Sequence, residues 1–254
     1  MLYCFMLITH AKTIDWKEGL LTQPLSKETC EQQFQMCKCV AEKENYCFPE
    51  YSAQIAPISE ELKTKMMGKS FHENCPVPVE DLSTIQLQYW NPEGEIYWGH
   101  ITVASVQADN VAKIFGELYY EQFPITSMKL IYEFKGSDDA SMRANNTSGF
   151  NCRPIKNTSR WSHHSYGQAI DINPLWNPWV RGNTVDPPEG KEFADRSNLQ
   201  PGMIKAGDAT VQAFEKYGWK WGGYWKKTKD YQHFSATGRS FRLAVDYISI
   251  TVEI

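Results

Sequence analysis

The sequence predicts an α+β fold in which a small antiparallel sheet is packed by helices on one side. Two neighbouring segments alternate apolar and polar residues with period two, and two others repeat apolar residues with helical spacing. Along the chain these segments follow one another as hairpin, helix, strand, loop, helix and strand, the order expected of an α+β domain. The 254 residues, 42% of them hydrophobic, are enough for one sizeable core.

The predicted hairpin lies between residues 85 and 103. Ile85, Leu87 and Tyr89 alternate with glutamines, which predicts a half-buried strand. Asn91-Pro92-Glu93-Gly94 supplies turn residues, and a second alternation follows at Tyr97, Gly99, Ile101 and Val103.

A helix is predicted after the hairpin, with Asp109 as its N-cap and Pro124 as its limit. Its apolar positions fall on one face: Val111, Ile114, Phe115, Leu118 and Tyr119. Another strand is expected around Met128 to Phe134.

Two further helices are predicted, one before the hairpin and one near the end of the chain. The first covers Ser59 to Met67. The second runs from Asp208, its cap, to Tyr217, with Gly218 as its terminator and a strand following at 219–221.

Bulk properties exclude two classes of partner. The net charge is -4, so the chain has no basic field to attract nucleic acid. No stretch approaches the about 18 consecutive apolar residues of a transmembrane segment.

Seven cysteines are present, and setting Cys4 aside leaves an even set. Four of the six lie between Cys30 and Cys47, a density typical of disulfides in oxidising compartments. A zinc knuckle is the alternative, but one residue separates Cys37 from Cys39, where structural zinc sites usually have two to four. The remaining members of the set are Cys75 and Cys152.

Four regions are predicted along the chain. Residues 1–11 resemble the end of a signal peptide without its positive segment, and 12–75 form a cysteine-rich N-terminal extension. Residues 76–235 form the main domain. The tail, 236–254, ends in an alternating pattern that could add an edge strand. We therefore expect a periplasmic or secreted protein.

The segment from Ser162 to Asp171 contains a candidate metal site. His164 and Asp171 are separated by small residues, Gly167 and Ala169, that let backbone segments approach closely. Zinc accepts both imidazole nitrogen and carboxylate oxygen. This spacing also occurs by chance in surface loops, so the segment alone does not establish a site.

A second cluster, Asp230-Tyr231-Gln232-His233, would complete the site. Catalytic zinc needs three protein ligands, and His233 would be the third. Asp230 could then accept a proton from the attacking water. The alternatives are a capping role for Asp230 and a backbone-bonded buried His233.

Together these motifs resemble a known family. Residues 162–171 resemble the Ser-x-His-x-x-Gly-x-Ala-x-Asp signature of the D-alanyl-D-alanine carboxypeptidase and L-alanyl-D-glutamate endopeptidase family of zinc peptidases, which shares its fold with the hedgehog signalling domain. The likeness covers roughly residues 68 to 234 and is greatest to the endopeptidase-type branch. Its other motifs are Phe150-Asn151-Cys152-Arg153-Pro154-Ile155, Asp171-Ile172-Asn173-Pro174, Asn177-Pro178, Gly218-Trp219-Lys220-Trp221-Gly222-Gly223-Tyr224-Trp225 and Asp230-Tyr231-Gln232-His233-Phe234.

The resemblance implies the roles of the metal and catalytic residues. His164, Asp171 and His233 match the family's ligands for one zinc ion, and Asp230 matches its acid/base. Arg153 matches the arginine that steadies the scissile carbonyl oxygen, with a surface ion pair as the alternative.

The resemblance also implies substrate contacts. Ser162 matches a substrate-contacting serine, although a local turn hydrogen bond explains it equally well. Trp221 and Trp225 are expected to wall the groove or pack beneath the zinc. His163 points away from the ligands if the segment is extended, and it is expected either to lie around the ligands without binding the metal or to be exposed.

The implied substrate is a stem peptide of peptidoglycan, cleaved as an L-Ala-D-Glu endopeptidase or a D-Ala-D-Ala carboxypeptidase would cleave it. Two rivals stand beside this reading: a non-catalytic zinc-containing cell-wall binding protein of the same fold, and a disulfide-rich envelope protein. The acid at Asp230 favours an enzyme. Ser235 departs from the endopeptidase pattern, and the C-terminal tail matches nothing in it.

Overall fold

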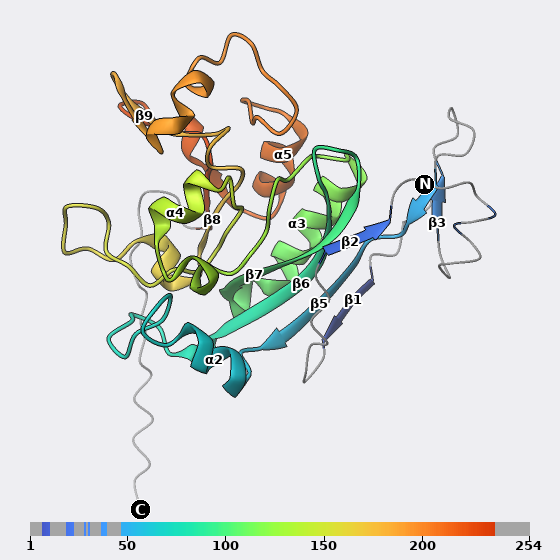
Figure 1. The fold of residues 1–254 in the computed structure, drawn as a ribbon, viewed down its shortest axis with the longest axis horizontal. Helices are drawn as coiled ribbons and strands as arrows, with labels where there is room; N and C mark the ends of the chain where they lie inside the picture. Colours follow the sequence, from blue (N-terminus) through green and yellow to red (C-terminus); the bar gives the residue numbers. More distant parts are fainter. Residues whose placement is uncertain are drawn as a thin grey trace, which may run out of the picture.

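The computed structural model describes residues 7–10, 19–22, 28, 30, 37–39 and 47–236 (Figure 1). Most of the predicted signal-peptide remnant and nearly all of the C-terminal tail, including its predicted edge strand, lie outside these residues. The described residues form an α+β fold, as predicted.

A five-stranded sheet with the order β1-β5-β6-β7-β2 forms the base of the molecule (Figure 1). β1 runs parallel to β5, and the other pairs are antiparallel. The strands are β1 Leu7–His10, β5 Ser52–Pro57, β6 Leu82–Trp90, β7 Ile96–Ala104 and β2 Gly19–Thr22.

The predicted hairpin is confirmed, because β6 pairs with β7 and places Ile85 opposite Ile101. The prediction of a half-buried strand is wrong: every residue of β6 is buried, including Gln86 and Gln88. Both faces of β6 are covered, and the backbone NH of Ser52 donates to Gln88 Oε1. β5 belongs to the predicted N-terminal extension yet pairs with β6, while the domain boundary at residue 75 stays a prediction.

Helix α3, Ala108–Tyr120, packs against β6 and also contacts α5, Ala209–Lys216. All five predicted apolar positions of α3 are buried. Asp109 is not the N-cap, because the helix continues from the 3-10 turn η2, Ser105–Gln107, and starts one residue earlier. In α5, Asp208 caps as predicted and accepts from the Val211 NH at 2.9 Å.

The strand predicted around Met128 to Phe134 is wrong. Met128 makes one ladder-like bond, its carbonyl accepting from the His100 NH, and Ile131–Phe134 then forms the 3-10 turn η3. Side chains take the backbone NH groups that a strand would need: Asn146 Oδ1 binds the Lys129 NH, and Glu133 Oε1 binds the Leu130 NH.

Helix α2, Glu60–Met66, confirms the first predicted helix, and Ser59 caps it. It packs into a second hydrophobic cluster together with Phe71 and Phe150. The remaining helical segments are η1 Val79–Asp81, α4 Asp138–Arg143, η4 His163–Tyr166, η5 Pro188–Ala194 and η6 Gly222–Tyr224.

Three small antiparallel sheets complete the described structure. One has the order β11-β13-β8, with β11 Lys220–Trp221, β13 His233–Ser235 and β8 Ala169–Asp171. Another has the order β10-β9-β12, with β10 Thr184–Asp186, β9 Trp179–Arg181 and β12 Lys229–Asp230. The third pairs β3, Cys37–Cys39, with β4, Cys47–Pro49.

Two disulfides join Cys30 to Cys37 and Cys75 to Cys152, and Cys47 is also disulfide-bonded. The preference for disulfides over a zinc knuckle is thereby confirmed for these cysteines. Among the described residues, no helix has the length and apolar character needed to cross a membrane.

The two disulfides predict different losses of stability. Replacing Cys75 and Cys152 by serine should lower the free energy of unfolding by about 2–5 kcal/mol, because that bond closes a long loop. The Cys30–Cys37 bond closes only 7 residues rather than 77, so its removal should cost about 2 kcal/mol less in the chain-entropy model. Urea unfolding of both double-serine variants measures the difference; equal losses would contradict it.

Candidate metal centre

His164 lies in the short turn η4, which is fixed at both ends. Ser162 Oγ accepts from the His164 NH at the start of the turn. Gly167 ends it at φ +63°, and its carbonyl accepts from the Ala104 NH at 2.8 Å. A Cβ on Gly167 would lie 2.3 Å from the Ala104 nitrogen, so only glycine lets the turn lie against the end of β7.

Asp171 is held by backbone pairing on both sides. In the β8–β13 ladder it lies directly opposite His233. On its other side it exchanges two backbone bonds with Ser148, at 3.0 and 2.9 Å. The carboxylate is therefore placed by backbone contacts on both of its flanks.

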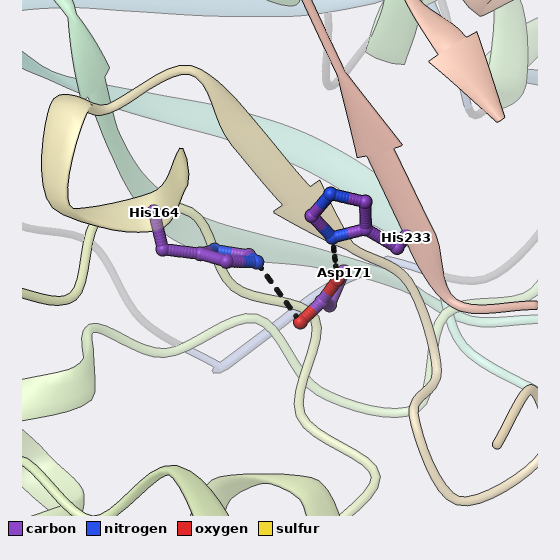
Figure 2. Close-up of side chains that lie close together, drawn as sticks. All are labelled: His164, Asp171 and His233. Carbon is purple, nitrogen blue, oxygen red and sulfur yellow. Dashed lines mark hydrogen bonds and ion pairs between the residues drawn. The ribbon is translucent and has the colours of Figure 1, made fainter. Parts of the chain in front are cut away.

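The three predicted ligands meet (Figure 2). His164 Nε2 lies 3.2 Å from Asp171 Oδ2, and His233 Nδ1 lies 3.0 Å from Asp171 Oδ1. One ligand atom from each residue lies within 4.8 Å of the others, and all three residues are buried. The other ring nitrogen of His164, Nδ1, donates to the Gly149 carbonyl at 2.7 Å, which directs Nε2 into the cluster.

This donor set fits zinc. Two imidazoles and one carboxylate are the ligands of many catalytic zinc sites. Burial alone would raise the pKa of Asp171, but the charge and hydrogen bond of His164 and the hydrogen bond of His233 outweigh it and hold that pKa well below its usual range. The carboxylate is therefore ionised at neutral pH and able to bind a cation.

Asp230 lies beside this cluster on β12, where it pairs with Trp179. Gly222 packs so closely that an added Cβ would lie 2.6 Å from the Asp230 carbonyl oxygen. Asp230 Oδ1 is buried and has no hydrogen-bond partner in the described part of the chain. Burial raises the pKa of Asp230 to about 7, and His233 opposes that rise. A bound divalent cation would favour the ionised form.

Arg153 makes the ion pair named as its alternative role. Its Nη2 lies 2.6 Å from Asp138 Oδ2, with side-chain exposures of 27% and 24%. The charge of Arg153 nevertheless reaches the centre, because it opposes the net rise in the pKa of both His164 and Asp230.

Ser162 and Trp221 make the contacts that were named as alternatives to a contact with substrate. Ser162 is buried and makes the local turn bond to the His164 NH. Trp221 is only 3% exposed, and its Nε1 donates to the Tyr231 carbonyl. Its ring packs against Phe234 in the core, so it lies beneath the site and leaves no surface for a substrate.

Besides the ligand His164, the rings of Trp225 and His163 lie beside His233. The partly exposed Trp225 has its ring centroid 5.6 Å from that of His233, consistent with a wall of the site. The ring centroid of His163 lies 6.2 Å from that of His233, so His163 lies around the ligands, one of its two expected positions, and does not point away as an extended segment would place it. The expectation assumed an extended segment, whereas η4 turns by about a third of a revolution per residue.

Comparison with known proteins gives one match. Residues 156–236 match the family model described as D-alanyl-D-alanine carboxypeptidase. The match contains the three ligands and Asp230, and it begins after Arg153. It confirms the resemblance inferred from the motifs over this range. No curated protein and no solved structure matches the chain.

A methyl group at Gly167 should destabilise the protein, because it would push the turn that carries His164 away from β7. Gly167→Ala incurs both a left-handed backbone cost of about 1 kcal/mol and a clash with β7. Gly182→Ala is the matched control, since Gly182 also has positive φ but open space around its Cβ position. Urea unfolding should show Gly167→Ala to be less stable than the control by about 1–3 kcal/mol; equal stability would show that η4 can move away from β7.

Metal analysis should separate the ligands from Asp230. We expect one zinc ion per chain, and Asp171→Asn should weaken zinc binding by more than about 100-fold, the upper end of the loss for an outer-shell partner. Asp230→Asn should retain stoichiometric zinc. Titration against a competing chelator measures both variants, and zinc loss in Asp230→Asn alone would reverse the two assignments.

Proposed function

We propose that this protein is a zinc-dependent peptidase that hydrolyses an amide bond in the stem peptides of peptidoglycan. One observation carries the proposal: His164, Asp171 and His233 bring their ligand atoms within 4.8 Å of one another. The family match over residues 156–236 supports the reaction class and the substrate class.

Zinc bound there would polarise the scissile carbonyl and acidify the attacking water. Asp230 has a buried oxygen, Oδ1, free of other hydrogen bonds among the described residues. In this scheme Asp230 accepts the proton from water and passes it to the departing amine. Arg153 stabilises the carbonyl oxygen as negative charge develops on it.

A non-catalytic cell-wall binding protein of the same fold is the rival. Binding alone needs no proton acceptor beside the metal ligands, yet Asp230 is kept there by a neighbouring glycine that admits no side chain. The disulfides support export of the protein to an oxidising compartment outside the cytoplasm, and peptidoglycan lies outside the cytoplasm as well. The proposal also includes the fold: as a member of this family, the protein would arrange its sheets as the hedgehog signalling domain does.

Within this class, the bond cleaved is either the terminal D-Ala-D-Ala bond or the L-Ala-D-Glu bond. The motifs resemble the endopeptidase branch and favour the second. Incubation with purified pentapeptide muropeptides followed by mass spectrometry distinguishes them. Loss of a single alanine identifies a carboxypeptidase, whereas release of a peptide that begins with D-Glu identifies an endopeptidase.

Asp230→Asn should lower kcat by about 100- to 10,000-fold, because the side chain keeps its size but cannot accept the proton. Asp195→Asn is the control, since Asp195 is exposed and bonds only to the nearby Ser197 in the described structure. Turnover of the muropeptide is measured with zinc content checked in each sample. Undiminished turnover in Asp230→Asn would remove Asp230 from the mechanism, and stoichiometric zinc without any turnover in the unaltered protein would favour the binding rival.

A further inference from the structure

One nitrogen of the Arg153 guanidinium makes an ion pair, and another has no hydrogen-bond partner among the described residues. Its Nη2 pairs with Asp138 Oδ2 at 2.6 Å. Its Nε is buried and has no hydrogen-bond partner among the residues that the structure describes. A buried N–H without an acceptor costs about 1–3 kcal/mol, so the guanidinium keeps this position at a cost in stability.

The segment that carries Arg153 is tied to the metal-ligand turn. Two backbone hydrogen bonds hold Arg153 there. Its NH donates to Ser165 Oγ at 2.9 Å, and its carbonyl accepts from the Ser162 NH at 3.1 Å. Two residues earlier, the Asn151 NH donates to the His164 carbonyl. The backbone of Arg153 thus has a fixed position relative to His164.

The side chain of Arg153 needs a second anchor, because it is long and flexible beyond its backbone. A guanidinium is planar and rigid, so an acceptor at one nitrogen sets the direction of its other N–H groups. Asp138 provides this acceptor from the first residue of α4, and Ser137 caps that helix through the Ala140 NH.

We propose that Asp138 is a positioning residue, which holds the guanidinium of Arg153 beside the metal centre, where it acts on the carbonyl oxygen of the substrate. This inference rests on the proposed function. It differs from a stabilising surface ion pair in requiring that Asp138 act on the reaction through Arg153.

A direct electrostatic effect of Asp138 is the competing explanation. Its charge contributes to the rise in the pKa of both His164 and Asp230, while that of Arg153 opposes the rise. Removing Asp138 could therefore change the reaction without any movement of Arg153. A double-variant cycle separates the two routes, because a direct effect survives the removal of Arg153.

The neighbouring residue offers a matched control. Asp139 follows Asp138 on the same helix, and its Oδ1 lies 3.8 Å from Lys156 rather than near Arg153. Asp139→Asn removes the same charge from the same turn of α4 and leaves the Arg153 pair intact.

The first experiment measures the hold on Arg153 without any substrate. In a ¹⁵N-labelled sample, Arg153→Lys identifies the Arg153 Nε–H resonance by its loss. Its exchange with water should be slow in the unaltered protein and in Asp139→Asn, and at least about tenfold faster in Asp138→Asn, since one hydrogen-bonded anchor is lost. Unchanged exchange in Asp138→Asn would overturn the proposal.

The second experiment measures muropeptide turnover. Asp138→Asn should lower kcat by about 10- to 100-fold with KM changed far less, the loss typical of an orienting partner. In the Arg153→Met background, Asp138→Asn should have no further effect. If the fold-losses in kcat of the two single variants multiply in the double variant, the direct electrostatic route is favoured and the proposal is overturned. Absence of turnover in the unaltered protein would instead refute the peptidase assignment, and the exchange measurement would still decide whether Asp138 holds Arg153.

Discussion

The pairing of β8 with β13 is the constraint on which the site depends. The ladder places Asp171 opposite His233 and Ile170 opposite Phe234. Because side chains alternate along a strand, Ile170 and Phe234 enter the core while their neighbours face the metal centre. Phe234 stacks on Phe214 of α5 at 3.9 Å, which fixes the register. A slip of β13 by one residue would move His233 to the opposite face of the sheet from Asp171.

The sequence predicted the elements whose pattern is local. The hairpin, α3 and α5 follow from periodicity and from the capping residue Asp208, and α2 lies within the helix predicted over Ser59 to Met67. The errors arose where distant groups decide the structure: the strand predicted at 128–134 is replaced because Asn146 and Glu133 take its backbone NH groups. The full burial of β6 was equally hidden, because alternation with glutamine is typical of an exposed face.

The ligand set could be predicted only through the family motifs, since spacing does not show that residues 171 and 233 are partners in one ladder. The positions of the residues around the ligands were harder to predict from the sequence. His163 does not point away because the segment is a 3-10 turn rather than extended. The sequence could not decide between the two roles of Trp221, because a tryptophan near a site can serve either the core or the wall. Arg153 makes the ion pair named as its alternative role, whereas its contact with a substrate carbonyl stays a prediction.

The centre is shaped mainly by backbone contacts, which explains why glycine occurs where it does. Gly167 lets η4 lie on the end of β7, and Gly222 lets η6 lie on Asp230. Neither contact can lengthen without moving a ligand or the acid, so the geometry is set by the fold. Such preorganisation suits a site that must keep two imidazoles, a carboxylate and a second acid within a few ångströms, because the protein meets the cost of bringing Asp171 and Asp230 together as it folds. A divalent cation then needs only to enter a set of ligands that already converge.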